Sequence, residues 1–412
     1  MKPGREQYVI IGNGVAGNEA LDVIRRLKPA ARVVLVAEEP HPFYSACVLS
    51  DYVAGDTGRK GLFLKKTTDY HGVELKLGET VTAVDVGKQR VCLGKGSIPY
   101  DRLILSLGGD AVVPPVPGAS GRGVAVLKTL RDAEKLIRSR APEAVVVGSG
   151  PTGIEAAIAL TKRGVRVTLI ELLGSVLPTL FDPDVGGKLE RILTEHAVRV
   201  HTGERVEEVL RTKGSVSGVR TDKREIPCRL VLFAVGVRPR TTLAADGNIT
   251  VGKRGGVAVN GRMETSIPGV YACGDCAEYV TDAGASVVRQ LWSTARRMGR
   301  IAGLNAAGHS GTYSDTDPGT VVDLFGTVAA SVGLQAGALG STARVTERQT
   351  QAGYSRIIVG GGRVVGAQFI GKLDDAWAVQ ALRGRVWEPS EVRVPMPGFP
   401  AYHWLSRVET RG

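Results

Sequence analysis

The sequence has few of the residues that mark secreted or metal-binding proteins, and it has no long apolar run. Its 412 residues include only five cysteines and six histidines, and neither type follows a disulfide framework or a metal-ligand spacing. No stretch reaches the roughly 18 apolar residues that a membrane-spanning helix needs. We therefore expect no metal site, no membrane span and a reducing, cytoplasmic location, with no room for a signal peptide before the first strand.

Features of nucleic-acid-binding proteins are also missing. The formal net charge is +12, yet no basic stripe with interleaved aromatic residues occurs, and aromatic residues make up only 5% of the chain. We interpret the charge as arginine spread over solvated faces or as a surface for an acidic protein partner. A hydrophobic content of 43% with 54 glycines fits a loop-rich α/β protein, and the length suggests two or three domains.

A glycine-rich stretch near the start of the chain gives the first indication of function. A hydrophobic strand from Tyr8 runs into Gly12-Asn-Gly14-Val-Ala-Gly17, and a helix is predicted from Asn18 to Leu27. In this context the first glycine permits a tight turn, the second admits a pyrophosphate, and the third lets the helix pack closely. The next strand ends at Glu38, where a ribose-binding acid belongs. The stretch therefore predicts dinucleotide binding at a helix N-terminus.

The same pattern occurs a second time. A hydrophobic strand precedes Gly148-Ser-Gly150-Pro-Thr-Gly153, and the strand after the following helix ends at Glu171. Two complete dinucleotide sites suggest two cofactors in tandem, with electrons passing between them. The Glu171 carboxylate would repel a 2′-phosphate and would accept a hydrogen bond from the ribose 2′-hydroxyl. This favours NAD over NADP. The nearby cations Lys162, Arg163 and Arg166 leave phosphate binding open as the alternative.

Other segments predict the remaining architecture. Residues 73–93 alternate between apolar and polar, as in a small antiparallel sheet. We expect an amphipathic helix from Gln290 to Ala306 and, within a small α/β piece at 320–385, a hairpin of strands 354–359 and 363–370. Beyond Val386 the chain is rich in proline and aromatic residues, and we expect an irregular tail that helps to dock a partner.

Taken together, these motifs resemble the pyridine nucleotide–disulfide oxidoreductase superfamily over nearly the whole chain. The resemblance includes both fingerprints, Ser106-Leu-Gly108, the turn at Gly236 and Gly274-Asp275. It implies an α/β fold with two Rossmann-like domains and with FAD and NAD as cofactors. The implied domains are an FAD domain at 1–112 and 243–312, an inserted NAD domain at 113–242, and a small C-terminal α/β interface domain at 313–412.

The resemblance also implies roles for individual residues. Glu38 and Asp275 would contact FAD, with Asp275 on the ribityl chain, and Glu155 matches a catalytic acid near the point where nicotinamide meets flavin. The helix that begins near Gln290 resembles one whose N-terminal dipole stabilises the reduced flavin. The full set of implied cofactor-binding residues is Gly12, Gly14, Ala16, Gly17, Glu38, Glu39, Ser106, Gly108, Gly148, Gly150, Thr152, Gly153, Glu171, Gly236, Gly274, Asp275 and Trp292.

Cys47 separates the subfamilies that the resemblance leaves open. Disulfide reductases carry a second cysteine five residues later, where this chain has Tyr52, so that disulfide is excluded. Single-cysteine relatives place one thiol beside the flavin, whereas flavoproteins with protein partners carry Tyr-x-x-x-x-Leu-Ser, which residues 44–50 match. Cys47 is therefore either a packing residue near the flavin or a redox thiol. Cys273 and Cys276 lie inside the flavin-binding turn and lack the further ligands that a zinc or iron–sulfur site needs.

The pattern looks closest to the FAD/NAD subunits of multi-subunit redox enzymes, such as tungsten aldehyde oxidoreductase and phenylglyoxylate dehydrogenase. We predict an FAD-dependent NAD(H):acceptor oxidoreductase whose partner is an iron–sulfur protein or a larger redox-enzyme subunit; outside such a complex, we expect a homodimer. The alternative is a single-cysteine NADH oxidase, peroxidase or CoA-disulfide reductase that uses Cys47. A third hypothesis is a flavin-bound regulator or scaffold in which turnover is incidental.

Overall fold

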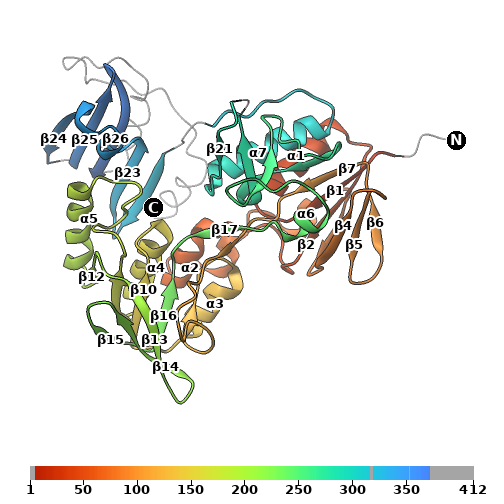
Figure 1. Ribbon diagram of the computed structural model, residues 1–412. Helices are drawn as coiled ribbons and strands as arrows, with labels where there is room; N and C mark the ends of the chain where they lie inside the picture. Colours follow the sequence, from red (N-terminus) through yellow and green to blue (C-terminus); the bar gives the residue numbers. More distant parts are fainter. Residues whose placement is uncertain (1–4, 282, 316–318, 352, 372–412) are drawn as a thin grey trace. The chain divides into compact units, whose positions relative to one another are not determined.

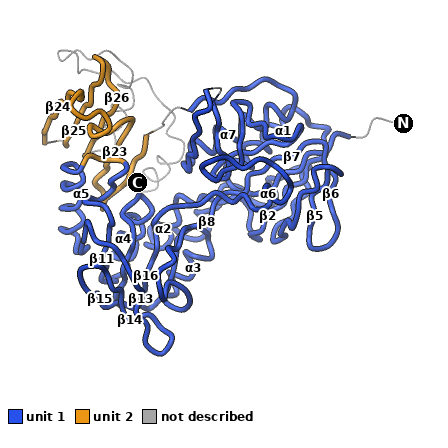
Figure 2. Tube along the Cα trace, viewed as in Figure 1, with its two compact units in different colours: residues 1–179, 183–318 blue, residues 180–182, 319–412 orange. Residues whose placement is uncertain are grey.

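The computed structural model describes residues 5–281, 283–315, 319–351 and 353–371. The chain divides into two compact units, residues 1–179 with 183–318 (unit 1) and residues 180–182 with 319–412 (unit 2) (Figure 2). Both glycine fingerprints belong to unit 1. The boundaries expected between an FAD and an NAD domain also fall within unit 1 and stay predictions. The expected docking tail beyond Val386 lies outside the described residues.

The first fingerprint belongs to a five-stranded parallel sheet with β1 at its centre. The strand order is β19-β7-β1-β2-β3, so the chain first moves to one side of β1 and later returns to the other. Such a reversal opens a crevice at the carboxyl ends of the strands, where dinucleotides bind. The strands are β1 (Gln7–Ile11), β2 (Arg32–Ala37), β3 (Val73–Leu77), β7 (Arg102–Leu105) and β19 (Val270–Ala272).

The second fingerprint belongs to a second parallel sheet with the equivalent order, β12-β11-β10-β16-β9. In each sheet the fingerprint strand is central, with an acid-terminated strand on one side and a strand that leads into a Gly turn on the other. The predicted internal repeat is therefore confirmed. The strands are β9 (Val124–Ala125), β10 (Glu143–Val147), β11 (Arg166–Ile170), β12 (Arg199–His201) and β16 (Leu230–Phe233).

Each parallel sheet is interrupted along the chain by a three-stranded antiparallel sheet, inserted between β3 and β7 in the first and between β12 and β16 in the second. The prediction for residues 73–93 is wrong in part, because β3 pairs in parallel with β2. As the edge strand of its sheet, β3 is only partly buried, so its sequence alternates like that of an antiparallel strand. The antiparallel strands are β4 (Val81–Asp85), β5 (Arg90–Leu93), β6 (Ser97–Pro99), β13 (Val206–Thr212), β14 (Ser215–Thr221) and β15 (Glu225–Pro227).

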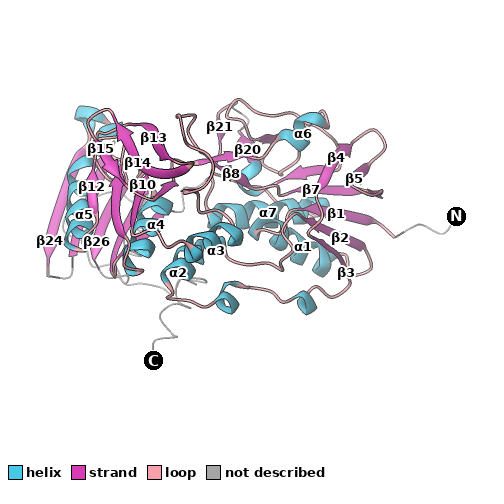
Figure 3. Cartoon of the chain, turned by 90° about the horizontal axis from the view of Figure 1, so that it is seen from below, coloured by secondary structure: helices cyan, strands magenta, loops and turns pink. Residues whose placement is uncertain are grey.

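Two helices pack closely against each other beside the first sheet. Figures 1 and 3 show α1 (Val15–Leu27) and α7 (Trp292–Ala306) side by side. A Cβ at Gly299 or Gly303 of α7 would collide with the backbone of α1, so these glycines allow the close approach. The helix predicted at Gln290–Ala306 is confirmed and begins two residues later. Among the described residues, no helix is long and apolar enough to cross a bilayer.

The other elements of unit 1 are shorter. A two-stranded ribbon, β8 with β17, links the regions of the two parallel sheets, and β18, β20 and β21 form a small sheet. The helices are α2 (Leu49–Ala54), α3 (Leu130–Arg138), α4 (Pro151–Lys162), α5 (Pro183–Glu195) and α6 (Thr242–Asp246), and the strands are β8 (Gly109–Ala111), β17 (Val237–Pro239), β18 (Val257–Val259), β20 (Ala277–Val280) and β21 (Ser286–Val287).

Unit 2 contains a five-stranded antiparallel sheet of order β22-β23-β26-β25-β24. The hairpin predicted around residues 354–370 is confirmed as β25 and β26. The expected α/β character is not found within residues 319–351 and 353–371, whose elements are strands and 3₁₀ turns; β-branched residues favour strands there. The strands are β22 (Thr320–Leu324), β23 (Thr327–Gly333), β24 (Arg344–Thr350), β25 (Gly353–Gly360) and β26 (Arg363–Gly371).

Candidate active site

The three glycines of the first fingerprint differ in the space around them. Gly12 has a φ of +109°, and a Cβ there would collide with the carbonyl oxygen of Ser106. A Cβ on Gly17 would collide with the carbonyl oxygen of Gly12, so α1 approaches the turn as closely as glycine permits. Gly14 faces open space, with no heavy atom within 4 Å of a Cβ placed there. This opening at the N-terminus of α1 fits a pyrophosphate.

The second fingerprint repeats this geometry. Gly148 has a φ of +97°, and a Cβ there would lie 2.6 Å from the carbonyl oxygen of Ala234. A Cβ on Gly153 would collide with the carbonyl oxygen of Gly148, whereas a Cβ on Gly150 would face open space. Thr152 is exposed in the first turn of α4. The structure therefore has two equivalent openings at helix N-termini, one at each fingerprint.

The first glycine turn is shaped by contacts of Ser106, Ala16 and Gly274. The Ser106 hydroxyl donates to the carbonyl oxygen of Ile11 at 2.8 Å and lies 3.1 Å from that of Gly12. Gly274 has a φ of +78°, and a Cβ there would lie 2.9 Å from the Ala16 Cβ. These residues, implied as cofactor contacts, are placed where they shape the turn by packing and hydrogen bonding.

The two acids that follow β2 have different surroundings. Glu38 is exposed and accepts a hydrogen bond from Arg240 Nη1 at 3.0 Å, while Arg240 Nε donates to Asp110 at 2.5 Å. Burial opposes the charge of Arg240, but the hydrogen bond and charge of Asp110, aided by Glu38, give it a raised pKa. Glu38 therefore lies exposed at the carboxyl end of β2, where a ribose-binding acid is expected.

Glu39 faces the protein rather than the edge. Both of its carboxylate oxygens lie 2.9 Å from the hydroxyl of Tyr44. Burial raises the pKa of Glu39, and burial together with this carboxylate raises the pKa of Tyr44. The Tyr44 oxygen also accepts the backbone N–H of Leu130 at 3.1 Å, at the start of α3. The Tyr44 hydroxyl thus links Glu39 to the N-terminus of α3.

Gly108 and Gly236 lie at the ribbon between the two parallel sheets. Their φ angles are +72° and +118°. The Gly108 carbonyl accepts the N–H of Arg240, and the Gly236 carbonyl accepts the N–H of Val112, both at 3.0 Å. The two glycines therefore turn the chain at the points where it passes between the sheets.

A second junction brings Glu155 next to the Cys47 segment. Ser50, in α2, donates its hydroxyl hydrogen bond to Glu155 Oε2 in α4 at 3.3 Å. Cys47 is exposed in the short 3₁₀ helix Ala46–Val48 directly before α2. Both implied catalytic residues therefore lie where α2 meets α4. Ser50 was not among the predicted site residues, although it ends the Tyr-x-x-x-x-Leu-Ser spacing.

The N-terminus of α7 offers donors for a flavin. Trp292 begins the helix and stacks on Phe43, with ring centroids 5.8 Å apart and an interplanar angle of 8°. Just before it, Gln290 Nε2 is buried without a hydrogen-bond partner. A buried unsatisfied donor at a positive helix end fits an acceptor oxygen of the flavin ring. With the open glycine cradle, these residues fit FAD.

Comparison with known proteins decides the family. The sequence model of a family described as "Pyridine nucleotide-disulphide oxidoreductase" matches residues 6–299, which include both fingerprints, Glu155 and Asp275. The chain belongs to this family. It is an α/β flavoprotein that uses FAD and a nicotinamide dinucleotide, and it is an FAD-dependent NAD(P)H oxidoreductase.

Similar proteins have varied activities. The chain is 30% identical over 377 residues to a nitrite reductase [NAD(P)H] of Bacillus subtilis, covering 89% of this chain and 46% of that protein. It is 30% identical to an NADH oxidase of Streptococcus pyogenes, covering 83% and 80%. The covalent putidaredoxin reductase–putidaredoxin complex contains a chain with a TM-score of 0.82 and 26% identity, covering 92% and 93%. The flavoprotein spans less than half the length of the nitrite reductases it matches.

The Cys-x-x-Cys of this flavoprotein is a packing feature. Cys273 and Cys276 are both fully buried, and burial raises the pKa of Cys273 and raises that of Cys276 to about 11. The Cys276 thiol contacts the carbonyl oxygens of Cys273 and Leu105 at 3.4 and 3.5 Å. Neither thiol has the environment of a reactive thiolate. Within the described ranges, no three His, Cys, Asp or Glu side chains gather to hold a metal ion.

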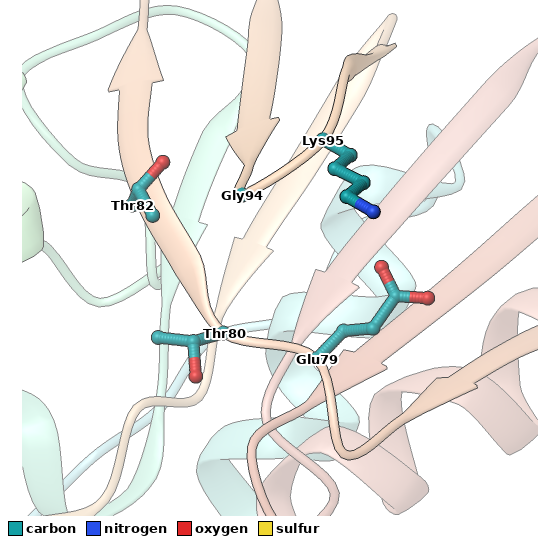
Figure 4. A pocket seen from close by; sticks show the side chains of 5 residues that line it. All are labelled: Glu79, Thr80, Thr82, Gly94 and Lys95. Carbon is teal, nitrogen blue, oxygen red and sulfur yellow. The ribbon is translucent and has the colours of Figure 1, made fainter.

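The flavoprotein also has a recess on the small β4–β5–β6 sheet. Its volume is about 430 Å³. Figure 4 shows the Glu79 carboxylate and the Lys95 ammonium pointing toward one another across it. The other lining residues are Thr80, Thr82 and Gly94. None of the implied cofactor or catalytic residues lines this recess.

Proposed function

We propose that this flavoprotein passes electrons between NAD(H) and an iron–sulfur protein, as the NAD-reducing subunit of a larger dehydrogenase of the tungsten aldehyde oxidoreductase or phenylglyoxylate dehydrogenase type. The observation that carries the proposal is Tyr52. It occupies, within α2, the position where a disulfide reductase needs its second cysteine after Cys47. Without that thiol pair, no internal redox disulfide can relay the electrons, which favours transfer from the flavin to an external acceptor.

The proposal gives each implied site residue a role. Bound FAD would supply the redox chemistry, that is, hydride acceptance from NADH and release of electrons to the acceptor. The amides beside Gly14 bind its pyrophosphate, Glu38 its ribose and Asp275 its ribityl chain. Gln290 and the N-terminus of α7 favour negative charge on the flavin. The second fingerprint would bind NAD(H), and Glu155, which accepts a hydrogen bond from Ser50, would act near the nicotinamide.

Relatives support an external acceptor without naming it. The solved putidaredoxin reductase is joined to its protein partner putidaredoxin, and it resembles this chain over nearly its whole length. The nitrite reductases carry a long region beyond the part that this chain matches. Both comparisons favour a reductase module that delivers electrons elsewhere.

A single-cysteine oxidase or CoA-disulfide reductase is the second candidate. Cys47 is exposed and lies directly before the helix that contacts Glu155 through Ser50. The matched region covers 80% of an NADH oxidase of Streptococcus pyogenes, which supports this candidate.

Anaerobic stopped-flow spectroscopy separates these functions. We expect NADH to bleach the flavin rapidly, ferricyanide and a purified ferredoxin to reoxidise it rapidly, and oxygen to reoxidise it slowly. Rapid aerobic turnover with a poor response to one-electron acceptors would instead assign the oxidase function. Binding of both cofactors without turnover with any acceptor would assign the regulator or scaffold role.

Cys47→Ser is expected to retain at least about half of the NADH-to-ferricyanide rate, because hydride transfer to flavin needs no thiol. The control is Cys92→Ser, which alters a half-buried cysteine in β5. Steady-state kinetics with FAD content measured for each variant tests the expectation. A loss of more than about 100-fold in Cys47→Ser alone, with FAD still bound, would replace the electron-transfer proposal by thiol chemistry.

The surroundings of Glu171 favour NAD over NADP. Glu171 Oε2 accepts the N–H and hydroxyl of Ser149 at 2.8 and 2.7 Å, which fixes the carboxylate beside the second fingerprint. Leu172 and Leu173, the next two residues, are exposed and apolar, so they offer a phosphate no charge.

The three cations that keep NADP binding open as an alternative make other contacts in the structure. Arg166 pairs with Glu143 at 2.7 Å at the start of β11, about 16 Å of strand away from Glu171. Lys162 pairs with Asp56 at 2.6 Å, and Arg163 donates to the carbonyl oxygens of Val53 and Ile137. None of these side chains is free to neutralise a 2′-phosphate at Glu171.

Glu171→Gln is expected to narrow the NADH preference in kcat/KM by roughly tenfold, about 1.4 kcal/mol. The amide keeps an oxygen for Ser149 and removes the charge that repels the phosphate. Glu143→Gln, at the opposite end of the same strands, is the matched control and should leave the ratio unchanged. Equal kcat/KM for NADH and NADPH in the parent protein would show that Glu171 does not select the cofactor.

A further inference from the structure

Lys128 makes an ion pair within unit 1 that joins the region of the first parallel sheet to the region of the second. We call these two regions the halves of unit 1. Its ammonium lies 3.0 Å from Asp275 Oδ2, and only 30% of the Lys128 side chain and 17% of the Asp275 side chain are exposed. The two residues are 147 positions apart. Lys128 precedes α3, which leads into the second parallel sheet, whereas Asp275 follows β19 of the first. The pair therefore forms at the acid proposed to hold the ribityl chain.

The backbone is fixed at both ends of this ion pair. Thr129 caps α3 in a reciprocal pair of hydrogen bonds with Asp132, at 3.2 and 3.0 Å, which sets the position of the neighbouring Lys128. Asp275 follows Gly274, whose positive φ and close approach to Ala16 fix the turn. Because both backbones are fixed, the ion pair restricts the orientation of the Asp275 carboxylate.

The charge of Lys128 bears on the reduction of FAD. An unpaired carboxylate beside the cofactor opposes the negative charge that the flavin gains when it is reduced. An ammonium paired with the carboxylate cancels that effect. The ammonium has three N–H donors, which is more than one carboxylate oxygen needs for its hydrogen bonds. We propose that Lys128 is a positioning residue, which orients Asp275 toward the ribityl chain and offsets its charge, so that reduced FAD is bound more tightly. This rests on the proposed role of Asp275.

The test compares three variants by FAD affinity of the apoprotein and by the midpoint potential of the bound flavin. Lys128→Met should weaken FAD binding about tenfold and make the potential more negative, by about 30 mV for each tenfold preferential loss of the reduced form. Lys128→Arg keeps the charge and should restore both values. Lys162→Met is the matched control: the Lys162–Asp56 pair also joins the two halves, with 37% and 35% of the side chains exposed, but includes no implied cofactor residue.

Parent-like affinity and potential in Lys128→Met would overturn the proposal. An equal change in Lys162→Met would also overturn it, because the effect would then belong to contact between the halves in general. Asp275→Asn separates this inference from the proposed site. If Asp275→Asn binds FAD like the parent, the role of Asp275 is wrong; if it loses affinity while Lys128→Met does not, only the role of Lys128 fails.

Discussion

A Gly14→Val variant is expected to fold normally and to be purified without its yellow cofactor. The N-cap backbone at Gly14 has φ of −78° and ψ of −174°, an extended conformation that valine adopts without strain. A Cβ there meets no heavy atom of the protein within 4 Å. The new side chain therefore occupies only the space through which the pyrophosphate reaches the amides. We expect FAD binding to weaken at least 100-fold, about 2.8 kcal/mol.

Gly150→Val provides the matched control. Gly150 occupies the same position in the second fingerprint, with φ of −64° and ψ of 173° and open space at its Cβ. This variant should keep its FAD and lose NADH binding. Absorbance spectra report flavin content, titration with NADH reports nucleotide binding, and thermal unfolding of the apoproteins reports the fold. A Gly14→Val protein with full flavin, or a Gly150→Val protein without it, would contradict the assignment of the two sites.

Local sequence was enough to predict the two cofactor-binding folds. The strand, glycine turn and helix at residues 8–27 and 144–162 are consecutive, so each fingerprint contains its own structural context. The structure shows what the glycines do: Gly17 and Gly153 press against the carbonyls of Gly12 and Gly148, while the middle glycines stay open. Because these contacts are made within about ten residues, the pattern reports them directly.

Contacts between distant segments could not be predicted in the same way. The pairs Ser50–Glu155 and Lys128–Asp275 join residues far apart in sequence, and no spacing rule connects them. The edge strand β3 was assigned to the wrong sheet because its partial burial resembles antiparallel alternation. The sequence also leaves the nucleotide preference open, because it does not show that Arg166 is paired at the opposite end of β11 from Glu171.

Unit 2 contains a buried polar cluster that no sequence motif indicates. Arg356 Nη1 and Gln368 Nε2 donate to Asp182 Oδ2 at 3.1 and 3.0 Å, and the N–H of Ala336 donates to Oδ1 at 3.0 Å. Only 6% of the Asp182 side chain and 8% of the Arg356 side chain are exposed. Asp182 thereby ties the segment Leu180–Asp182 to the C-terminal sheet within unit 2.

Asp182→Ala is expected to destabilise unit 2 by about 3–5 kcal/mol, because it leaves a buried guanidinium and two further donors without their acceptor. Glu347 also pairs with Arg356, but its side chain is 46% exposed and water screens its charge, so it compensates only in part. Guanidinium unfolding, with hydrogen exchange of β25 and β26, measures the loss. The control Asp184→Ala removes an exposed acid in the first turn of α5 and should cost less than about 1 kcal/mol. A loss below 1 kcal/mol in Asp182→Ala would mean that the sheet holds Leu180–Asp182 by apolar packing and backbone contacts rather than by this ion pair.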